Sequence, residues 1–218
     1  MHTEDAARVA AIVEKLRDAY PDANCALNFM TPLDLLVATI LAAQCTDERV
    51  NIVTATLFET YRTARDYANA APDVLETAVK PTGFYRNKAR NIQATSRILI
   101  ERHGGGVPTT MEELVVLPGV ARKTANVVLG NAYDIVVGVA VDTHVGRVSR
   151  RFGLTDADDP IVVERDLMVI LPRDEWLSTG HRLIAHGRAV CQSRKPRCAD
   201  CTLSAICPSA GTFGAPPL

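Results

Sequence analysis

Four cysteines near the C-terminal end have a spacing that could hold a metal. The pattern C-x6-C-x2-C-x5-C, within 17 residues, is formed by Cys191, Cys198, Cys201 and Cys207. Four thiolates suit an iron–sulfur cluster or a tetrahedral zinc ion. Structural zinc sites usually combine two short C-x2–4-C pairs, and this loop has only one. We therefore predict an iron–sulfur cluster, with a zinc ion as the second interpretation. Four unmetallated buried cysteines are the third interpretation, which the basic residues Arg194, Lys195 and Arg197 inside the loop disfavour.

A second segment, LVVLPGVARKTANVVL at 114–129, predicts two helices joined by a tight turn. Pro118 cannot continue the first helix, and Gly119 can adopt positive φ in the turn. The second helix begins near Ala121 and would present free N–H groups to an anion such as a DNA phosphate. Such backbone contacts position DNA without reading its bases. The alternative is an ordinary hairpin of two helices.

A lysine and an aspartate follow this turn. Lys123 falls in the first turn of the second helix, where the positive end of the helix dipole disfavours its charged form. An uncharged lysine amine is a nucleophile that can form a Schiff base, although a solvated lysine beside a phosphate is an equally good interpretation. Asp142, in VDTHVGRVSRR, suits the N-cap of the next helix. The same carboxylate could stabilise a cationic sugar or activate a nucleophile.

Helices must position these side chains, because hydrophobic periodicity of the helical kind runs through most of the chain. We predict helices over 5–19, 33–41, 47–61, 86–102, 111–116, 121–132, 143–152, 161–170 and 175–190. Residues 135–141 are β-branched, but no second strand is available to pair with them, so we expect a buried extended connector. The fold class is therefore all-α. The tail at 208–218 is rich in Pro, Gly and Ala, and we expect it to be disordered.

The composition of the 218 residues is that of a globular protein, with 47% hydrophobic and 22% charged residues. The net charge of −1 does not by itself suggest nucleic-acid binding. However, 80–102 carries six basic residues and one acidic, 181–198 carries five basic and none acidic, and 156–175 carries seven acidic and two basic. This segregation permits one basic and one acidic face, although solvated helix surfaces are the commoner cause of charge runs.

The sequence contains neither a secretory signal pattern nor an apolar stretch of membrane-spanning length. We therefore expect a cytoplasmic protein whose cysteines stay reduced unless they hold a metal. Cys25 and Cys45 lie in apolar helical surroundings, and we expect them to be inert core residues.

In combination, these segments resemble the endonuclease III family of the helix-hairpin-helix DNA glycosylase superfamily. The likeness runs from about residue 5 to 207 and is specific in the order and spacing of Lys123, Asp142 and the cysteine loop. The matching stretches are ILAAQCTD at 40–47, TGFYRNKARNI at 82–92, LPGVARKTANVVL at 117–129, VAVDTHVGRVSRR at 139–151, HGR at 186–188 and the cysteine loop.

The resemblance implies two helical domains flanking a DNA-binding cleft. One would be a six-helix barrel over 25–135 with the helix-hairpin-helix at about 111–132. The other would be an iron–sulfur domain made of 1–24 and 136–207. The implied activity is that of a bifunctional DNA glycosylase and AP lyase of base excision repair. Its implied partner is double-stranded DNA with oxidised pyrimidines or abasic sites, bound by a monomer associated with the bacterial nucleoid.

The resemblance also implies roles for individual residues. Lys123 matches the nucleophile that attacks C1′ of the damaged nucleotide, and Asp142 matches the carboxylate that assists base departure and lysine activation. The resulting Schiff base permits β-elimination, which nicks the strand 3′ to the lesion. The four cysteines match the ligands of a [4Fe–4S] cluster, which would hold the phosphate-binding side chains of Arg194, Lys195 and Arg197.

Further matches concern the handling of DNA. Gln44 matches the residue that fills the space left by the flipped nucleotide, and Phe84 stands where the family inserts an apolar wedge, often Leu, into the opposite strand. Gly119 belongs to the phosphate-binding hairpin. Ala121 stands where the family commonly has Gly, which puts DNA affinity in doubt. Related hairpins hold a monovalent cation, and the matching carbonyls here are those of Val115, Leu117 and Val120.

Two alternative functions stay open. A sister mismatch glycosylase would share fold and cluster, but such enzymes are monofunctional and lack the hairpin lysine, so Lys123 argues against this alternative. A non-catalytic DNA-binding module would need only the hairpin and the basic loop. The presence of both Lys123 and Asp142 favours the enzyme, because binding alone requires neither.

Overall fold

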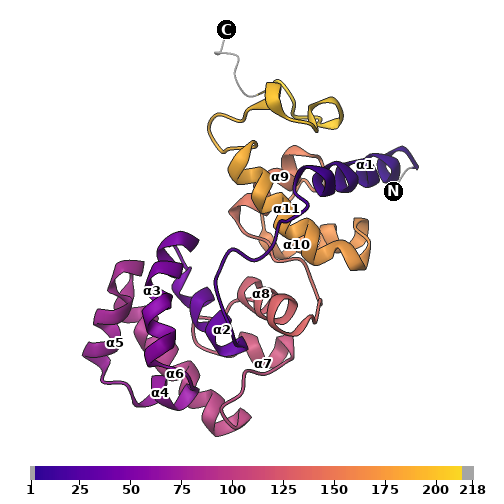
Figure 1. Cartoon of the computed structure of the whole chain (residues 1–218). Helices are drawn as coiled ribbons and strands as arrows, with labels where there is room; N and C mark the ends of the chain where they lie inside the picture. Colours follow the sequence, from indigo (N-terminus) through magenta and orange to yellow (C-terminus); the bar gives the residue numbers. More distant parts are fainter. Residues whose placement is uncertain (1–2, 213–218) are drawn as a thin grey trace. The chain divides into compact units, whose positions relative to one another are not determined.

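The computed structural model describes residues 3–212, and all regular structure within them is helical. The prediction of an all-α fold is confirmed. Residues 135–141 form a connector that pairs with no strand in the described range, as predicted; it bends at Gly138 and is partly rather than wholly buried. The chain divides into two units, Cys25–Val137 and Met1–Asn24 with Gly138–Leu218 (Figure 1).

The unit Cys25–Val137 has seven α-helices, one more than the six that the resemblance implies. The extra helix arises at Pro72, which pushes Ala71 into an extended conformation and so separates two short helices that the periodicity did not predict. The helices are α2 (Pro32–Leu41), α3 (Asp47–Thr60), α4 (Ala64–Asn69), α5 (Pro72–Val79), α6 (Tyr85–His103), α7 (Met111–Val115) and α8 (Arg122–Tyr133), with a 3-10 turn η1 (Lys80–Thr82) before α6.

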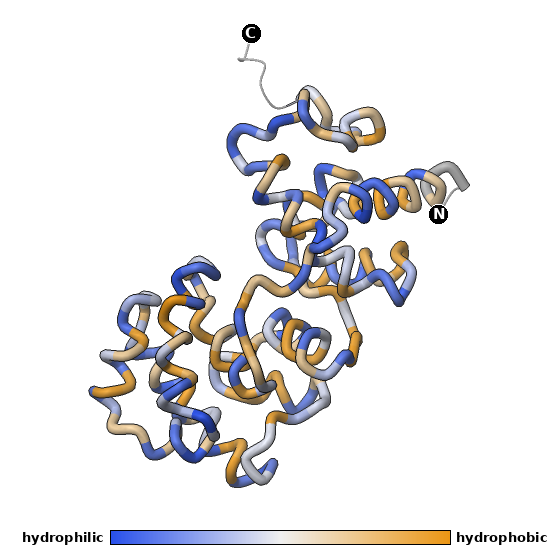
Figure 2. The backbone as a smooth tube through the Cα atoms, viewed as in Figure 1, coloured by the Kyte–Doolittle hydropathy of each residue, from blue (hydrophilic) through white to orange (hydrophobic). Residues whose placement is uncertain are grey.

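Helix α2 is the centre of this unit. A capping box of Thr31 and Asp34 begins the helix, and Pro32 occupies its first position. All residues of 33–41 are buried, and α2 packs on α3, α6 and α8. Hydrophobic and hydrophilic segments alternate along the other helices, as expected for helices with one buried face (Figure 2).

The other unit joins the N-terminal helix to the last third of the chain. Helix α1 packs against α11 (Figure 1), and the guanidinium of Arg17 forms an ion pair with Glu175. Arg8 donates a hydrogen bond to the carbonyl of Phe152 at 2.6 Å. The helices of this unit are α1 (Thr3–Ala19), α9 (Thr143–Arg151), α10 (Pro160–Ile170) and α11 (Trp176–Ala189), with 3-10 turns η2 (Arg173–Glu175), η3 (Cys198–Asp200) and η4 (Ser204–Ile206).

The end of the chain corrects one prediction. Disorder does not begin at residue 208, because 208–211 form turns in which the Ala210 N–H donates to the Cys207 carbonyl at 3.0 Å. Ser209 and Ala210 also line the cavity of the cysteine loop, so packing orders this part of the tail. Residues 213–218 lie outside the described residues. No helix within 3–212 is long and apolar enough to cross a membrane.

Candidate functional site

The predicted hairpin consists of α7, a tight turn and α8. Gly119 in the turn has φ +81°, and a Cβ atom there would lie 2.9 Å from Nδ2 of Asn91. The turn is also fastened to α6, since the Thr95 hydroxyl donates to the Pro118 carbonyl at 2.9 Å. The turn therefore requires glycine, both for its backbone angle and for the close approach of α6.

Ala121 is the N-cap of α8, with φ −90° and ψ 169°. This is extended backbone that any residue adopts, so alanine causes no strain where the family commonly has glycine. Its side chain makes no capping hydrogen bond. The side chain of Ala121 therefore does not compete for the N–H groups at the start of α8. The binding of an external anion at this helix end requires such an arrangement.

Lys123 is exposed in the first turn of α8. Burial raises the pKa of the nearby Cys25 thiol, the charge of Asp47 adds to the rise, and the charge of Lys123 opposes it. The charge of Lys123 therefore lies within electrostatic range of Cys25. Both Cys25 and Cys45 are only partly buried, packed against the edge of the core rather than inside it.

Gln44 and Phe84 occupy exposed loops and share an unusual backbone. Their φ angles are +53° and +47°, and Asp134 is the only other non-glycine residue in 3–212 with positive φ. This conformation costs about 1–2 kcal/mol for a residue with a side chain. The Phe84 side chain is 64% exposed at the start of α6, where an aromatic ring has no stabilising role in the core.

Asp142 is the N-cap of α9, as predicted. Its Oδ1 accepts hydrogen bonds from the N–H groups of His144 and Val145, both at 2.8 Å. Its Oδ2 accepts none from residues 3–212, and the side chain is half-buried. One carboxylate oxygen is therefore committed to the helix, and the other is available for chemistry. Asp142 and Lys123 belong to different units.

All four cysteines of the loop line one cavity, which is partly open to solvent. They form no disulfides. Among residues 3–212, no group of three or more His, Cys, Asp or Glu side chains has the arrangement of a single-ion site. Cys191 is buried, and the other three are partly buried.

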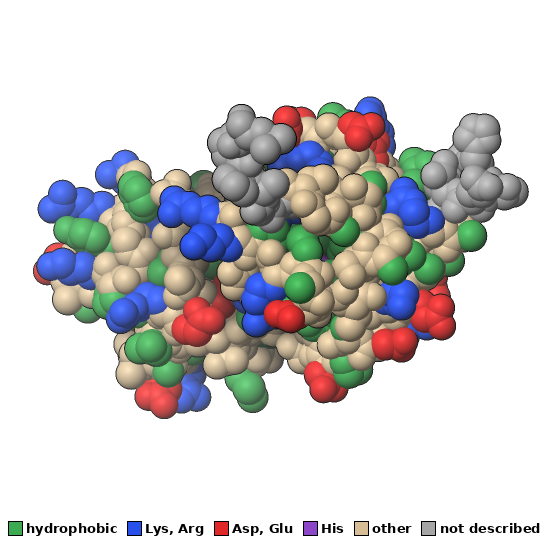
Figure 3. Space-filling model, turned by 90° about the horizontal axis from the view of Figure 1, so that it is seen from above, with side chains coloured by type: hydrophobic (Ala, Val, Ile, Leu, Met, Phe, Trp, Pro, Cys, Tyr) green, Lys and Arg blue, Asp and Glu red, His purple; other side chains and the backbone are tan. Residues whose placement is uncertain are grey.

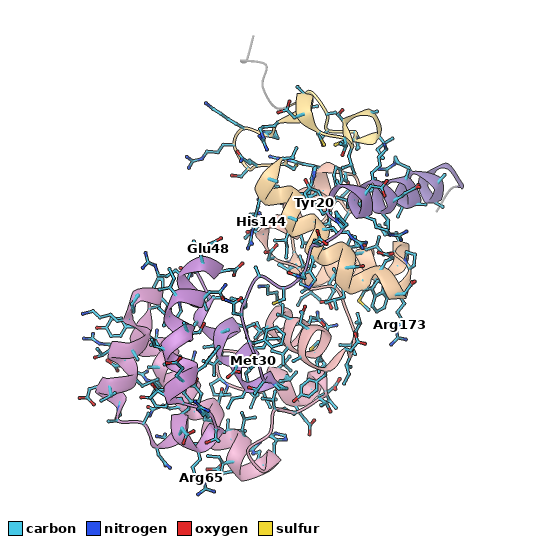
Figure 4. The ribbon with its side chains drawn as sticks, viewed as in Figure 1. Tyr20, Met30, Glu48, Arg65, His144 and Arg173 are labelled. Carbon is cyan, nitrogen blue, oxygen red and sulfur yellow. The ribbon has the colours of Figure 1, made fainter. Side chains whose placement is uncertain are left out.

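Three residues around this cavity were missed in the sequence. The Tyr20 hydroxyl lies 3.0 Å from Nδ1 of His186, whose Nε2 lies 3.7 Å from Sγ of Cys201; Figure 4 labels Tyr20 at the end of α1. Burial lowers the pKa of His186 to about 4. The ring is thus neutral at pH 7, and it donates from Nε2 when Tyr20 donates to Nδ1. Arg151 places Nη1 3.3 Å from Sγ of Cys191.

Two arginines of α9, Arg147 and Arg151, bond to the end of α11 and the start of the cysteine loop. Arg147 donates to the carbonyl of Gly187 at 2.9 Å, and Arg151 donates to those of Gln192 and Ser193 at 2.7 and 2.8 Å. An arginine on a helix surface can contact phosphate or simply be solvated, whereas these bonds hold protein backbone. The HGR motif at 186–188 was the only signal for this arrangement, and the sequence assigned it no role.

The basic side chains of segments 80–102 and 181–198 are not all exposed to solvent. Lys88 is buried, and Arg197 donates to the Ala189 carbonyl, whereas Arg194 and Lys195 are exposed. The face drawn in Figure 3 carries both basic and acidic side chains. A charge count along the sequence includes every lysine and arginine of these segments, whether buried or exposed. Side-chain burial depends on tertiary contacts, which such a count does not contain.

Comparison with known proteins assigns the chain to a family. Residues 37–173 match the family described as HhH-GPD superfamily base excision DNA repair protein. The endonuclease III of Synechocystis sp. is 54% identical over 203 residues, 93% of each chain. That of Bacillus subtilis is 47% identical over 196 residues, 89% of each chain. The chain belongs to the endonuclease III family.

The fold comparison agrees with this assignment. A solved structure of a trapped endonuclease III–DNA covalent intermediate has a TM-score of 0.91 and 44% sequence identity. The match covers 97% of this chain and 99% of that one. This member of the endonuclease III family therefore shares both sequence and fold with its relatives along nearly its whole length.

Proposed function

We propose that this member of the endonuclease III family is a DNA glycosylase and AP lyase of base excision repair. It removes oxidised pyrimidines from double-stranded DNA and nicks the strand 3′ to the abasic site. The observation that carries the proposal is the exposed amine of Lys123 in the first turn of α8, directly after the hairpin turn. A related endonuclease III with the same fold has been solved as a trapped covalent intermediate with DNA.

In the proposed reaction, the uncharged amine of Lys123 attacks C1′ of the damaged nucleotide. A C–N bond to lysine forms while the glycosidic bond breaks, and the base departs with the electron pair and a proton. The lysine nitrogen of this adduct then loses a proton, and its lone pair breaks the C1′–O4′ bond while the ring oxygen takes up a proton, which gives a Schiff base. The Schiff base acidifies C2′; loss of a proton there expels the 3′ phosphate by β-elimination. Asp142 takes the proton that makes Lys123 nucleophilic and stabilises the cationic sugar through Oδ2, since Oδ1 is occupied by the cap of α9.

The DNA-binding residues act around this chemistry. The N–H groups at the start of α8, beyond Gly119 and Ala121, bind a phosphate. Gln44 fills the space left by the extruded nucleotide, and Phe84 wedges into the opposite strand; extrusion costs a few kcal/mol and is cheapest at a damaged pair. The exposed loop residues Arg194 and Lys195 contact further phosphates, and Arg197, fastened to Ala189, contributes its remaining charge.

The group that fits the four cysteines best is a [4Fe–4S] cluster. All four thiols line one cavity, and their C-x6-C-x2-C-x5-C spacing contains only one of the two short pairs that structural zinc sites usually combine. Arg151 and His186 add N–H donors near Cys191 and Cys201, a common second layer around cluster sulfurs. When bound, the cluster supplies four metal–sulfur bonds that fix the loop and hence its basic residues.

Two further predictions stay untested. A monovalent cation would bind at the hairpin through the carbonyls of Val115, Leu117 and Val120; the Leu117 carbonyl already accepts the Val120 N–H at 3.1 Å. The protein would work as a monomer in the cytoplasm, associated with the nucleoid.

Borohydride trapping tests the function. The reductant should fix an adduct between the chain and a duplex with an oxidised pyrimidine, and Lys123→Gln should abolish it. Lys15→Gln, which changes an exposed lysine of α1, should leave the adduct unchanged. An adduct that survives Lys123→Gln moves the nucleophile elsewhere. Base release without any adduct supports a sister monofunctional glycosylase, and binding without base release supports a DNA-binding module.

A further inference from the structure

Lys88 on α6 has its side chain buried inside the unit Cys25–Val137. It is only 4% exposed, although lysine is almost never fully buried without a partner. Its Nζ donates to the carbonyl of Leu41 at 2.8 Å and to that of Thr82 at 2.7 Å. Burial lowers the pKa of Lys88, which measures the cost of keeping the ammonium there.

The two carbonyl groups that accept from Lys88 each lie at the C-terminal end of a helical element. Leu41 is the last residue of α2, and Thr82 is the last residue of η1. Carbonyls at helix ends lack intrahelical partners and lie at the negative end of the helix dipole. A single ammonium therefore satisfies the ends of two elements that are far apart in the sequence.

Both elements lead directly into the loops that carry strained, exposed side chains. Gln44 follows Leu41 by three residues, and Phe84 follows Thr82 by two. Their positive φ angles, +53° and +47°, persist only where the surroundings hold the backbone firmly. Lys88 bonds the residue at the base of each loop, so it sets the separation between them.

A buried ammonium carries a desolvation cost that an apolar residue of similar volume would avoid. What an apolar residue cannot supply is a directed bond to each loop. We propose that Lys88 is a positioning residue that holds the loops of Gln44 and Phe84 at a fixed separation, so that both side chains enter the duplex together during nucleotide extrusion. The inference rests on the proposed function, which assigns these two loops to DNA.

The first test compares two substrates with Lys88→Met, which keeps the length of the side chain but removes its donors. Base release from a lesion-bearing duplex should fall roughly 10- to 100-fold, the effect of misplacing a group by about 1 Å. Elimination at an abasic site in a single-stranded oligonucleotide should stay near the wild-type rate, because it needs Lys123 but no insertion into a duplex. An equal loss on both substrates would overturn the proposal.

Gln93→Met is the matched control. Gln93 is another buried polar residue of α6, 8% exposed, and its Nε2 donates to the Ala70 carbonyl at 2.8 Å. Ala70 leads to α5 rather than to a DNA-inserting loop. The variant should therefore affect stability without discriminating between the two substrates, and a duplex-selective loss here would contradict the special role of Lys88.

A double mutant separates positioning from general destabilisation. If Lys88 acts through the Phe84 loop, Lys88→Met should add little to the loss of duplex activity that Phe84→Ala already causes. Multiplicative losses in the double mutant would show that the two residues act independently and would overturn the proposal.

A binding measurement keeps the proposal testable without catalysis. The ratio of affinities for a duplex with a tetrahydrofuran abasic analogue and for an intact duplex should fall in Lys88→Met. If that variant does not fold, Lys88→Gln, which retains N–H donors, should lower the same ratio by less. An unchanged ratio overturns the role of Lys88, whereas absence of base release by the wild type, with a lowered ratio in the variant, rejects only the proposed activity.

Discussion

Helix α2, at the centre of the unit Cys25–Val137, and the cysteine loop are stabilised by different kinds of interaction. Nine consecutive residues of α2 are buried, and seven of them are apolar, so hydrophobic packing dominates there. In the 22 residues of 191–212, only Cys191 and Leu203 are buried, and the regular structure is limited to two three-residue 3-10 turns. A segment with so small a core requires other restraints, which here are arginine–carbonyl bonds and the proposed cluster.

The comparison explains where each kind of function resides. The packed unit can hold strained loops such as those of Gln44 and Phe84, because rigid surroundings fix their backbone. The cysteine loop can present Arg194 and Lys195 to solvent only as long as its own restraints hold. Removing one restraint should therefore have very different consequences in the two regions.

The largest effect is expected when the cluster is lost. The wild-type protein should contain about four irons per chain and absorb broadly in the visible range. Cys201→Ser should abolish most of this absorption and of duplex binding, because the loop would lose a ligand and its fixed shape. Cys45→Ser changes a partly buried cysteine outside the loop and should retain both properties. One zinc and no iron in the wild type would refute the cluster.

The second-largest effect is expected at Asp142, where a substitution can separate its role as a helix cap from its role as a base. Asparagine caps a helix as well as aspartate does but cannot act as a base, so Asp142→Asn should slow base release about 10²- to 10⁴-fold with little change in stability. Single-turnover rates and urea unfolding measure the two quantities. Asp159→Asn is the control, since Asp159 caps α10 with bonds to Ile161 and Val162 at 2.9 and 3.1 Å. An equal slowing in both variants would make Asp142 a cap only.

Core truncations test the comparison directly. Leu36→Ala, at a fully buried position of α2, should lower the free energy of unfolding by about 2–5 kcal/mol. Leu203→Ala in the cluster-loaded protein should cost less, because metal–sulfur bonds also hold that loop. Val169 is 78% exposed, and Val169→Ala should stay within about 0.5 kcal/mol of the wild type. Equal costs at Leu36 and Leu203 would mean that the loop depends on packing after all.

The smallest effect concerns the hairpin. Gly119→Ala would strain a backbone at φ +81° and press on Asn91, so we expect a loss of about 1–2 kcal/mol in stability and a matching loss of duplex affinity. Gly106→Ala should be milder, because its Cβ would meet only the His103 carbonyl at 3.5 Å without positive φ. Duplex affinity should also fall steeply with salt in the wild type, and a flat salt response would contradict phosphate binding.

The sequence predicted nine of the eleven α-helices described within 3–212 and missed two short ones. Each predicted helix matches an observed one to within two residues at either end. A buried stripe repeats along the longer helices, and the Pro118-Gly119 turn revealed the five-residue helix α7. Helices α4 and α5, with 6 and 8 residues, hold too few turns for such a pattern. Their caps, Thr63 with Asp66 and Pro72 after Ala71, were the signals that could have revealed them.

By itself, the sequence determined which chemical groups are present and in what order: a hairpin lysine, a capping aspartate and four closely spaced cysteines. Their spacing along the chain is a local property, and it sufficed to indicate the family. Only the tertiary structure decided which charges are buried. It placed Lys88 between two helix ends and turned Arg147 and Arg151 toward the cysteine loop. The reason is physical: burial depends on contacts between segments distant in sequence, which no local pattern of residues contains.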